Sequence, residues 1–457
     1  MQTLTVNDIL RATGGEIAIK SSNIAGLEFD GIITDSRKVK DGALFIPLVG
    51  ETLDGHDFIK SALAHGASAS LTERQPDGDE RGTVIRVKDT RKALGDIARY
   101  YKKKYSVPVA SITGSVGKTT TKDLIYAVLA EHYKTHKTPN NFNNDIGVPL
   151  TVFGITEDHE MAVIEMGMNH FGEIAYLADI VKPDIAIITN IGMSHIENLG
   201  SQEGIFKAKM EITTGFTDKN TLYVNGDDKF LKTVQSDSYK VVRFGLDSSN
   251  DVYAKDIVNK GLDGTEFTVV SDKGEFRAEV MQPGIHNVYN ALAAVCAGLH
   301  FGVTEEECAE GLKNCQYTAG RLEVINHKGI EIINDCYNSS PDSIRAALKV
   351  QQFSLNPRKI AVLGDVLELG GFAKDAHYEL GKDVAESGVD MLITAGENAA
   401  KIAEGAKANG MMNVKSYAAT DDACREIADI IKEGDSVLVK ASHGMHFEKI
   451  TEAIRSL

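Results

Sequence analysis

A glycine-rich loop at residues 114–120, which reads Gly-Ser-Val-Gly-Lys-Thr-Thr, has the residue types and spacing of a phosphate-binding site. Glycines let the backbone close around phosphate oxygens, and N–H groups at the start of a helix point at a bound anion. Lys118 would balance the phosphate charge, and the hydroxyl of Thr119 would reach a magnesium ion carried by the nucleotide. The loop therefore predicts binding of a nucleoside triphosphate. The residues expected to hold its phosphates are Gly114, Ser115, Val116, Gly117, Lys118, Thr119 and Thr120.

The elements around this loop support that interpretation. Residues 107–113 form a short apolar run typical of a buried strand, and residues 118–133 carry Leu124, Ile125 and Val128 at helical spacing. The commonest form of the loop has a further glycine at the position of Ile112, so the motif alone is weak. In its strand–loop–helix order, it favours nucleotide binding over an ordinary turn.

Two polar residues follow other apolar runs. Glu165 ends the run at residues 161–165, and His195 comes shortly after the run at residues 184–189. Because parallel sheets bind ligands at the carboxyl ends of their strands, we expect both side chains near the loop. There Glu165 could reach a magnesium ion that bridges phosphates. Taken singly, each residue would more often be a polar side chain facing solvent.

Three residues further along the chain each allow two interpretations. Asn287 and Asn290 lie three positions apart at the start of a predicted helix and therefore share a face. They could cap that helix or hydrogen-bond the edge of a nucleotide base, and their spacing leaves both open. Arg321 could bind a phosphate or be a surface arginine at a domain junction. The polar loop at residues 334–343 lies between a predicted strand and helix, where an α/β domain commonly keeps its site.

Composition limits the class of protein. The chain has 457 residues, 42% of them hydrophobic and 25% charged, as in soluble globular proteins. Its formal net charge of −16 argues against binding nucleic acid or anionic membranes, which needs a basic surface. We expect no signal peptide and no membrane span, because the first residues and the apolar runs lack both patterns. The five cysteines form no Cys-x-x-Cys pair, which favours reduced thiols and a cytoplasmic location.

The order of apolar runs predicts an α/β fold in three domains, since about 150 residues per domain is usual. Residues 1–85 form a small α/β unit. Residues 86–317 contain strands alternating with helices, the pattern of a parallel sheet, with a β insertion at residues 239–282. Residues 318–457 repeat the strand–helix rhythm as a second, Rossmann-like α/β domain.

Taken together, these residues resemble the Mur ligase family, ATP-dependent enzymes that form amide bonds in peptidoglycan precursors for the cell wall. The loop at residues 113–120 is similar to the family's ATP loop. Glu165, His195 and a lysine of residues 207–212 (Lys-Ala-Lys-Met-Glu-Ile) match the positions where the family binds two magnesium ions. One lysine of the family is carbamylated. We assign it to Lys209, with Lys207 as the alternative register.

The resemblance also implies roles for other residues. Asn287 and Asn290 match the helix on the adenine side, and Arg321 matches an arginine that reaches the ATP phosphates from the third domain. It implies a catalytic set of Lys118, Glu165, His195, Lys209 and Arg321, and metal ligands Thr119, Glu165, His195 and Lys209 as its carbamate.

Within the family, the chain resembles ligases that join D-alanyl-D-alanine to UDP-N-acetylmuramoyl-tripeptide. Residues 34–37 and 50–56 are similar to a UDP-binding first domain, and residues 138–150 to an asparagine-rich substrate loop. Residues 335–343 and 363–370 match third-domain signatures, whereas the Asp-Asn-Pro-Arg loop of many ligases of the preceding step is absent. The substrate-binding residues implied are Asp35, Ser36, Arg37, Asn141, Asn143, Asn144 and Asn338.

The implied reaction forms an acyl phosphate from ATP and then an amide. Asp335 and Asn338 are candidates for ATP or dipeptide contacts, and we expect the third domain to close over ATP. Residues 440–443 read Lys-Ala-Ser-His where the family usually has Lys-Gly-Ser-Arg, so the role of that arginine is not carried over to His443. The sequence does not specify the third residue of the tripeptide, lysine or diaminopimelate, or the oligomeric state, for which we expect a monomer.

Other functions explain less of the chain. A ligase of the preceding step or a folylpolyglutamate synthetase shares the ATP loop and the amide chemistry, but the latter lacks a first domain like residues 34–56. A P-loop kinase or GTPase leaves residues 138–150 and the third domain unexplained. A nucleotide-sensing module without catalysis would not need Lys118, Glu165, His195 and Lys209 together.

Overall fold

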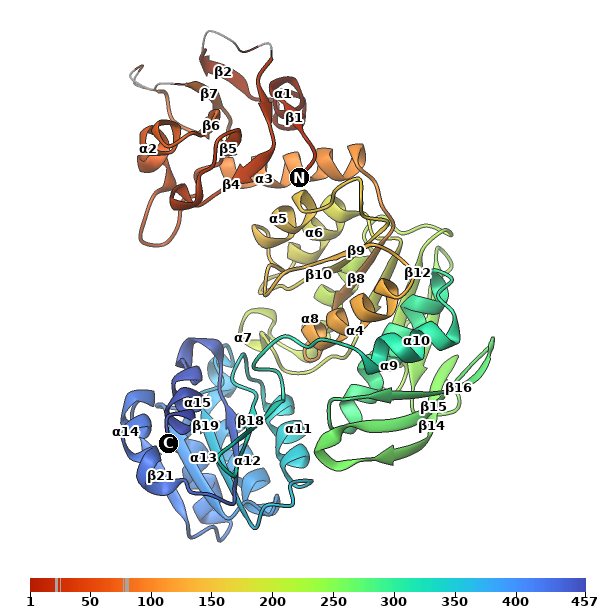
Figure 1. Cartoon of the computed structure of the whole chain (residues 1–457), viewed down its shortest axis with the longest axis vertical. Helices are drawn as coiled ribbons and strands as arrows, with labels where there is room; N and C mark the ends of the chain where they lie inside the picture. The colour runs from red at the N-terminus through yellow and green to blue at the C-terminus, as the bar shows by residue number, and fades with distance from the viewer. Residues whose placement is uncertain (21–23, 25, 77, 79–81) are drawn as a thin grey trace.

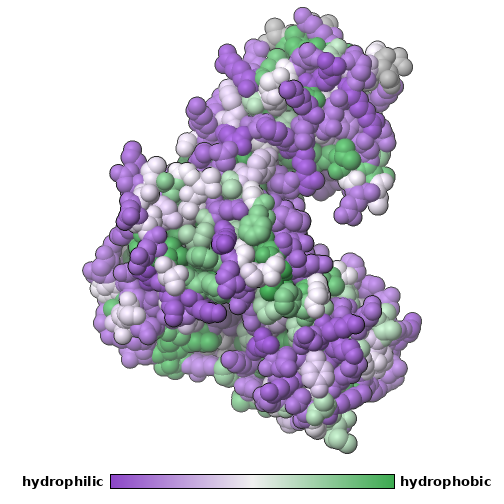
Figure 2. Space-filling model, turned by 180° about the vertical axis from the view of Figure 1, so that it is seen from behind, coloured by the Kyte–Doolittle hydropathy of each residue, from purple (hydrophilic) through white to green (hydrophobic). Residues whose placement is uncertain are grey.

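The computed structural model describes residues 1–20, 24, 26–76, 78 and 82–457. Three sheets covered by helices follow one another along the chain, one in each of three α/β domains (Figure 1). This confirms the predicted fold class. The molecule is crescent-shaped, and the space-filling view shows a largely hydrophilic face hollowed between the first and third domains (Figure 2).

The first domain is built on a five-stranded sheet of order β2-β7-β6-β5-β4, in which β2 alone is antiparallel to its neighbour. A separate two-stranded ribbon, β1 with β3, leads into helix α1, whose start is fixed by a capping box between Thr5 and Asp8. The strands are β1 (Leu4–Thr5), β2 (Glu16–Ile19), β3 (Glu28–Phe29), β4 (Gly31–Ile33), β5 (Ala43–Phe45), β6 (Ala69–Thr72) and β7 (Thr83–Arg86), and the helices are α1 (Val6–Thr13) and α2 (Ile59–Ala64).

Helix α3 (Thr90–Lys104) joins the first two domains. Its apolar side chains recur every three or four residues and form buried surface along the helix. The helix contacts α1 in the first domain, and α5 (Gly147–Phe153) and α6 (Glu173–Val181) in the second. Tyr101 bonds to both domains, because its hydroxyl accepts a hydrogen bond from Gln2 N at 2.7 Å and donates one to Ile155 O at 2.5 Å. The helix therefore holds the first domain against the second.

The central domain contains a nine-stranded sheet of order β16-β15-β14-β13-β12-β11-β8-β10-β9. The seven strands β9, β10, β8, β11, β12, β13 and β14, in sheet order, run parallel to one another. Strands β15 and β16 are antiparallel to their neighbours. The strands of the predicted β insertion at residues 239–282 extend the central sheet at one edge. The strands are β8 (Val109–Thr113), β9 (Thr135–Lys137), β10 (Met161–Glu165), β11 (Ile185–Ile188), β12 (Thr221–Asn225), β13 (Lys240–Gly245), β14 (Val252–Asn259), β15 (Thr265–Ser271) and β16 (Gly274–Val280).

Alternation along the central strands divides the core into two layers. Ile185 and Ile187 pack in one cluster with α4 and α9, whereas Ala186 and Ile188 pack in the other with α5 and α6. Strands buried on both faces read as continuous apolar runs, which is why the sequence revealed β8, β10 and β11. The remaining helices of this domain are α4 (Lys118–Ala130), α7 (Ile196–Leu199), α8 (Gln202–Met210), α9 (Ile285–His300) and α10 (Glu305–Lys313).

The third domain has a six-stranded sheet of order β17-β18-β22-β19-β20-β21, parallel except for β17. Helices α11, α12 and α13 cover one face, and α14 and α15 cover the other. The strands are β17 (Glu323–His327), β18 (Ile330–Asn334), β19 (Arg358–Gly364), β20 (Met391–Ala395), β21 (Val414–Tyr417) and β22 (Asp435–Lys440), and the helices are α11 (Pro341–Gln351), α12 (Ala373–Glu386), α13 (Ala399–Ala408), α14 (Thr420–Ile430) and α15 (Glu448–Arg455).

Short 3-10 helices occur in all three domains: η1 (Ser36–Lys38), η2 (Gly55–Phe58), η3 (Glu211–Thr213), η4 (Leu231–Thr233), η5 (Gly261–Asp263), η6 (Gly370–Phe372) and η7 (His443–Met445). In the part of the chain that the structure describes, no helix is both long enough and apolar enough to cross a bilayer.

Candidate active site

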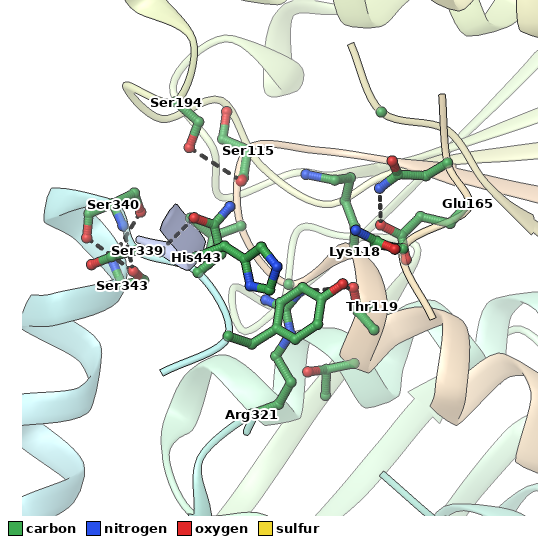
Figure 3. Close-up of a pocket in the computed structure, with 18 of the residues that line it drawn as sticks. Ser115, Lys118, Thr119, Glu165, Ser194, Arg321, Ser339, Ser340, Ser343 and His443 are labelled. Atoms are coloured by element: carbon green, nitrogen blue, oxygen red, sulfur yellow. Dashed lines mark hydrogen bonds between the residues drawn. The ribbon is translucent and has the colours of Figure 1, made fainter. Parts of the chain in front are cut away.

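A cavity of about 350 Å³ lies where the central and third domains meet (Figure 3). Its walls combine the loop between β8 and α4, the asparagine-rich loop, the end of β10, the start of α9 and several third-domain segments. Most of the residues predicted from the sequence line it. They are Ser115, Val116, Gly117, Lys118, Thr119, Thr120, Asn141, Asn143, Asn144, Glu165, His195, Asn287, Asn290, Arg321, Asp335 and Asn338.

The glycine-rich loop is held in place by its neighbours. Val116 N donates a hydrogen bond to Asn190 Oδ1 at 2.9 Å, and Val116 O accepts one from the Thr189 hydroxyl at 2.7 Å. Lys118 Nζ donates to Gly114 O at 2.9 Å, so the amine folds over the loop. The loop therefore has a defined shape before any ligand binds.

Gly114 lies behind the cavity rather than in its wall. Its φ is +156°, and a Cβ there would lie 1.9 Å from Thr189 Oγ1, so only glycine fits. Gly117, the first residue before α4, has φ +85°, and a Cβ there would lie 2.8 Å from Asn290 Oδ1. Both glycines are thus required by the path of the backbone.

The asparagine pair of α9 packs behind the loop. Asn290 Nδ2 donates to Asn287 Oδ1 at 3.0 Å, and Asn290 Oδ1 accepts a hydrogen bond from the Thr121 hydroxyl at 3.1 Å. Asn287 Nδ2 donates to Pro283 O at 2.8 Å, so neither side chain caps the first N–H groups of the helix. The capping alternative is therefore wrong, and the pair joins α9 to α4.

Glu165 ends β10 and is 1% exposed. Its Oε1 accepts a hydrogen bond from Asn143 Nδ2 at 2.8 Å, whereas its buried Oε2 has no partner among the described residues. Its charge raises the pKa of Lys118, although burial has the larger effect and lowers that pKa. An unpartnered carboxylate oxygen beside a phosphate loop suits a magnesium ion, which takes few protein carboxylates together with phosphate oxygens.

Lys209 is buried on α8, whereas Lys207 is exposed. Burial, together with the positive charge of Lys118, lowers the pKa of Lys209 well below its ordinary value. Burial therefore favours the neutral form of the amine, which is the form that reacts as a nucleophile. Lys209 lies outside the cavity wall, close enough to Lys118 for their charges to interact.

His195 precedes α7 and has a left-handed backbone, with φ +64°. Its Nδ1 lies 2.6 Å from Oε2 of Glu368 in the third domain, and this contact is the main cause that lowers the pKa of Glu368. Sequence reasoning missed Glu368, although the residue follows the carboxyl end of β19, where polar side chains of an α/β domain gather.

Within the described parts of the chain, no group of three His, Cys, Asp or Glu side chains is arranged to hold a metal ion.

Arg321 reaches from the start of the third domain to the loop. Its Nη2 donates to the Thr119 hydroxyl at 3.2 Å, and its guanidinium lies 4.1 Å from the ring centre of Tyr337. The Tyr337 ring in turn lies 5.5 Å from the ring of His443. The rings of Tyr337 and His443 support the Arg321 guanidinium, which bridges the two domains. The sequence did not indicate this role for Tyr337 or His443.

Asp335 is engaged in a buried ion pair. Lys440 Nζ lies 2.5 Å from Asp335 Oδ2 and donates to Asn338 O at 3.0 Å. The other oxygen of Asp335 accepts a hydrogen bond from Leu322 N at 3.1 Å. Burial lowers the pKa of Lys440, and the Asp335 carboxylate opposes that effect. Lys440 was not predicted as a site residue, because its partner is about a hundred positions away in the sequence.

The predicted UDP-binding residues do not join this cavity. Asp35, Ser36 and Arg37 lie in or next to η1 of the first domain. Hydrogen bonds from Arg37 lower the pKa of Asp35 to about 2. The first domain stands apart from the third across the opening of the crescent (Figure 1).

A strand–loop–helix phosphate site, a buried carboxylate at the end of the neighbouring strand and an arginine from another domain define a nucleotide-binding site built for phosphoryl transfer. Family models agree: the Mur ligase middle domain matches residues 112–298, the Mur ligase glutamate ligase domain residues 320–443, and the Mur ligase family catalytic domain residues 28–102. The chain belongs to the Mur ligase family, which confirms the resemblance.

Several known proteins are similar to this chain over nearly all of their length. UDP-N-acetylmuramoyl-tripeptide–D-alanyl-D-alanine ligase of Bacillus subtilis (strain 168) is 42% identical over 427 residues, 92% of each chain. The ligase of the same name from Escherichia coli (strain K12) is 32% identical over 100% of this chain and 99% of its own. A crystal structure of MurF from Acinetobacter baumannii superposes with a TM-score of 0.93 at 32% identity, covering 100% of both chains. MurF ligase from Thermotoga maritima in complex with ADP gives 0.82 at 28% identity, covering 93% of this chain and 97% of its own.

Proposed function

We propose that this protein is an ATP-dependent ligase that adds D-alanyl-D-alanine to UDP-N-acetylmuramoyl-tripeptide and forms the UDP-linked pentapeptide of peptidoglycan synthesis. Full-length similarity to ligases of that name supports the substrates. The observation that carries the chemistry is the cavity in which a phosphate loop faces polar segments of a second domain. Because the reaction consumes ATP, we also propose a cytoplasmic location.

The proposed reaction has two steps. The terminal carboxylate of the tripeptide attacks the γ-phosphate of ATP, which forms an acyl phosphate and releases ADP. The free amine of the dipeptide then attacks the acyl carbon, and the tetrahedral intermediate collapses to an amide and inorganic phosphate. Lys118 and Arg321 balance the negative charge that develops on the transferred phosphoryl group. Closure of the third domain excludes water, which would otherwise hydrolyse the acyl phosphate.

The residues present fit a magnesium site. Glu165 Oε2 is a buried carboxylate oxygen without a partner among the described residues, and Thr119 and His195 line the same cavity. We propose these three and the carbamate of Lys209 as ligands of two magnesium ions, which would supply charge neutralisation at the phosphates when bound. The carbamate would form when the neutral amine of Lys209 adds to carbon dioxide and releases a proton. This converts a neutral amine into an anionic oxygen ligand.

The remaining assignments follow the same scheme. We propose that Asp35, Ser36 and Arg37 bind the UDP moiety, and that Asn141, Asn143 and Asn144 contact the peptide end of that substrate. Asn287 and Asn290 would lie on the adenine side, and Asp335 and Asn338 would contact ATP or the dipeptide. We place the domain boundaries at residues 1–85, 86–317 and 318–457, and propose a monomer because one chain supplies all these groups.

Phosphate release by the purified protein tests the proposal. ATP, UDP-N-acetylmuramoyl-tripeptide and D-alanyl-D-alanine are supplied together, and each is omitted in turn. We expect phosphate only with all three, together with a UDP-linked pentapeptide by mass spectrometry. Release without the dipeptide, or with a single amino acid or a folate in its place, would contradict the proposal and favour a sister ligase.

Small-angle scattering with and without ligands tests closure of the third domain, and identical profiles would exclude that closure.

A further inference from the structure

A second cavity, of about 200 Å³, adjoins the first at the phosphate-binding loop. Lys118 and His195 form part of its central-domain wall, and residues 366–369 part of its third-domain wall. In the proposed reaction the acyl phosphate forms at the γ-phosphate, which Lys118 faces. The acceptor amine must therefore arrive through space bordered by Lys118 and the third domain.

Glu368 is the one carboxylate among the described residues that line this second cavity. Its side chain is 50% exposed, and its Oε2 lies 2.6 Å from Nδ1 of His195. Its charge also acts on Lys118 and raises the pKa of that amine, against the larger lowering by burial. A negative group from the third domain thus lies against His195 and near Lys118 of the central domain, in the direction from which a cationic acceptor would approach.

The backbone around Glu368 is held so that the carboxylate keeps this direction. Glu368 has φ +62°, a left-handed conformation that is strained for a non-glycine residue. On its amino-terminal side, Val366 N donates to His377 Nε2 at 2.9 Å and Leu367 N donates to the Ser442 hydroxyl at 2.9 Å. These bonds fix the loop on α12 and on the segment after β22, so the strained residue is kept in place by its surroundings.

The rest of the wall suits a small dipeptide. Val366, Leu367 and Leu369 offer apolar side chains, and the buried hydroxyl oxygen of Ser339 has no partner among the described residues. D-Alanyl-D-alanine carries an ammonium group, two methyl groups and a carboxylate. We propose that Glu368 binds the ammonium group of the incoming dipeptide, in place of His195, and holds that nitrogen facing the acyl phosphate. The ammonium group loses one proton to solvent there, and the resulting free amine is the nucleophile. This inference rests on the proposed function and adds the residue that recognises the acceptor.

Substitution of the carboxylate by its neutral amide tests the inference. In Glu368→Gln we expect the KM for D-alanyl-D-alanine to rise about tenfold to a hundredfold, because a hydrogen bond to a charged group is lost. The KM values for ATP and for the UDP-tripeptide should stay within about twofold, since neither substrate would touch Glu368. Glu404→Gln, which removes a carboxylate from an exposed ion pair with Lys401 on α13, is the matched control and should change none of these constants.

A change in the ligand separates binding from a distorted loop. Propionyl-D-alanine has the shape of the dipeptide without its ammonium group, and its inhibition constant should be the same for the wild-type protein and Glu368→Gln within about threefold. An inhibition constant that rises as much as the dipeptide KM would overturn the inference, as would an unchanged dipeptide KM. A rise in the KM for ATP alone would assign Glu368 to the nucleotide and also overturn it. Wild-type protein that releases phosphate without the dipeptide would instead refute the proposed function.

Discussion

Removing the cation from the buried Asp335–Lys440 pair should unfold the third domain locally. The side chains of Lys440 and Asp335 are 2% and 11% exposed, and Lys440 Nζ lies 2.5 Å from Asp335 Oδ2. Lys440→Met leaves the carboxylate with the hydrogen bond from Leu322 N but without its counter-ion. Breaking such a buried pair from one side destabilises a protein by about 3–5 kcal/mol, because the remaining charge is uncompensated.

Hydrogen exchange can measure this loss in one domain of the three. The pair joins β18, which Asp335 follows, to β22, which Lys440 ends, and the two strands pair in parallel. We expect backbone amides of β18 and β22 to exchange about 10² to 4 × 10³ times faster in Lys440→Met, since each 1.4 kcal/mol corresponds to a factor of ten. Amides of β8 and β10 in the central domain should exchange at the wild-type rate and serve as an internal control.

The double variant Asp335→Asn/Lys440→Met decides whether the charge is the cause. It removes both ions and should recover most of the lost protection, because replacing a buried pair with neutral groups is often close to neutral. Unchanged exchange in Lys440→Met would refute the reasoning. So would a double variant whose losses are the sum of the two single ones, since the two groups would then not be coupled.

Three further predictions concern the site. Gly114→Ala should abolish ATP binding by calorimetry, because its Cβ would lie 1.9 Å from Thr189 Oγ1, while Gly371→Ala, which meets nothing within 4 Å, should bind normally. His286, at the start of α9, also lines the cavity, and burial lowers its pKa to about 4. The unfolded chain therefore takes up a proton at a higher pH than the folded chain, and stability falls as the pH drops below about 6.5. His286→Gln should therefore lose less thermal stability than the wild-type protein between pH 6.5 and pH 4, and equal losses would contradict this. Glu165→Gln should lower kcat by about a hundredfold or more with little change in fold by circular dichroism, whereas wild-type turnover would exclude a role in phosphoryl transfer.

Local patterns account for most of what could be predicted. The loop at residues 114–120 is one continuous segment, so its chemistry can be read without knowing any distant contact. Strands β8, β10 and β11 are buried on both faces and read as apolar runs, which also placed Glu165 at a strand end. Strands β17 and β21 escaped prediction, because each is an edge strand with exposed positions and no such run.

The sequence by itself therefore determined the fold class, the family, the phosphate loop and the residue types around it, because these depend on short periodic patterns and contiguous motifs. The tertiary structure decided which side chains meet. Sheet order brings Lys440 to Asp335, and the approach of two domains brings Glu368 to His195 and Arg321 to Thr119. Such contacts depend on how distant segments pack, and no spacing along the chain records them.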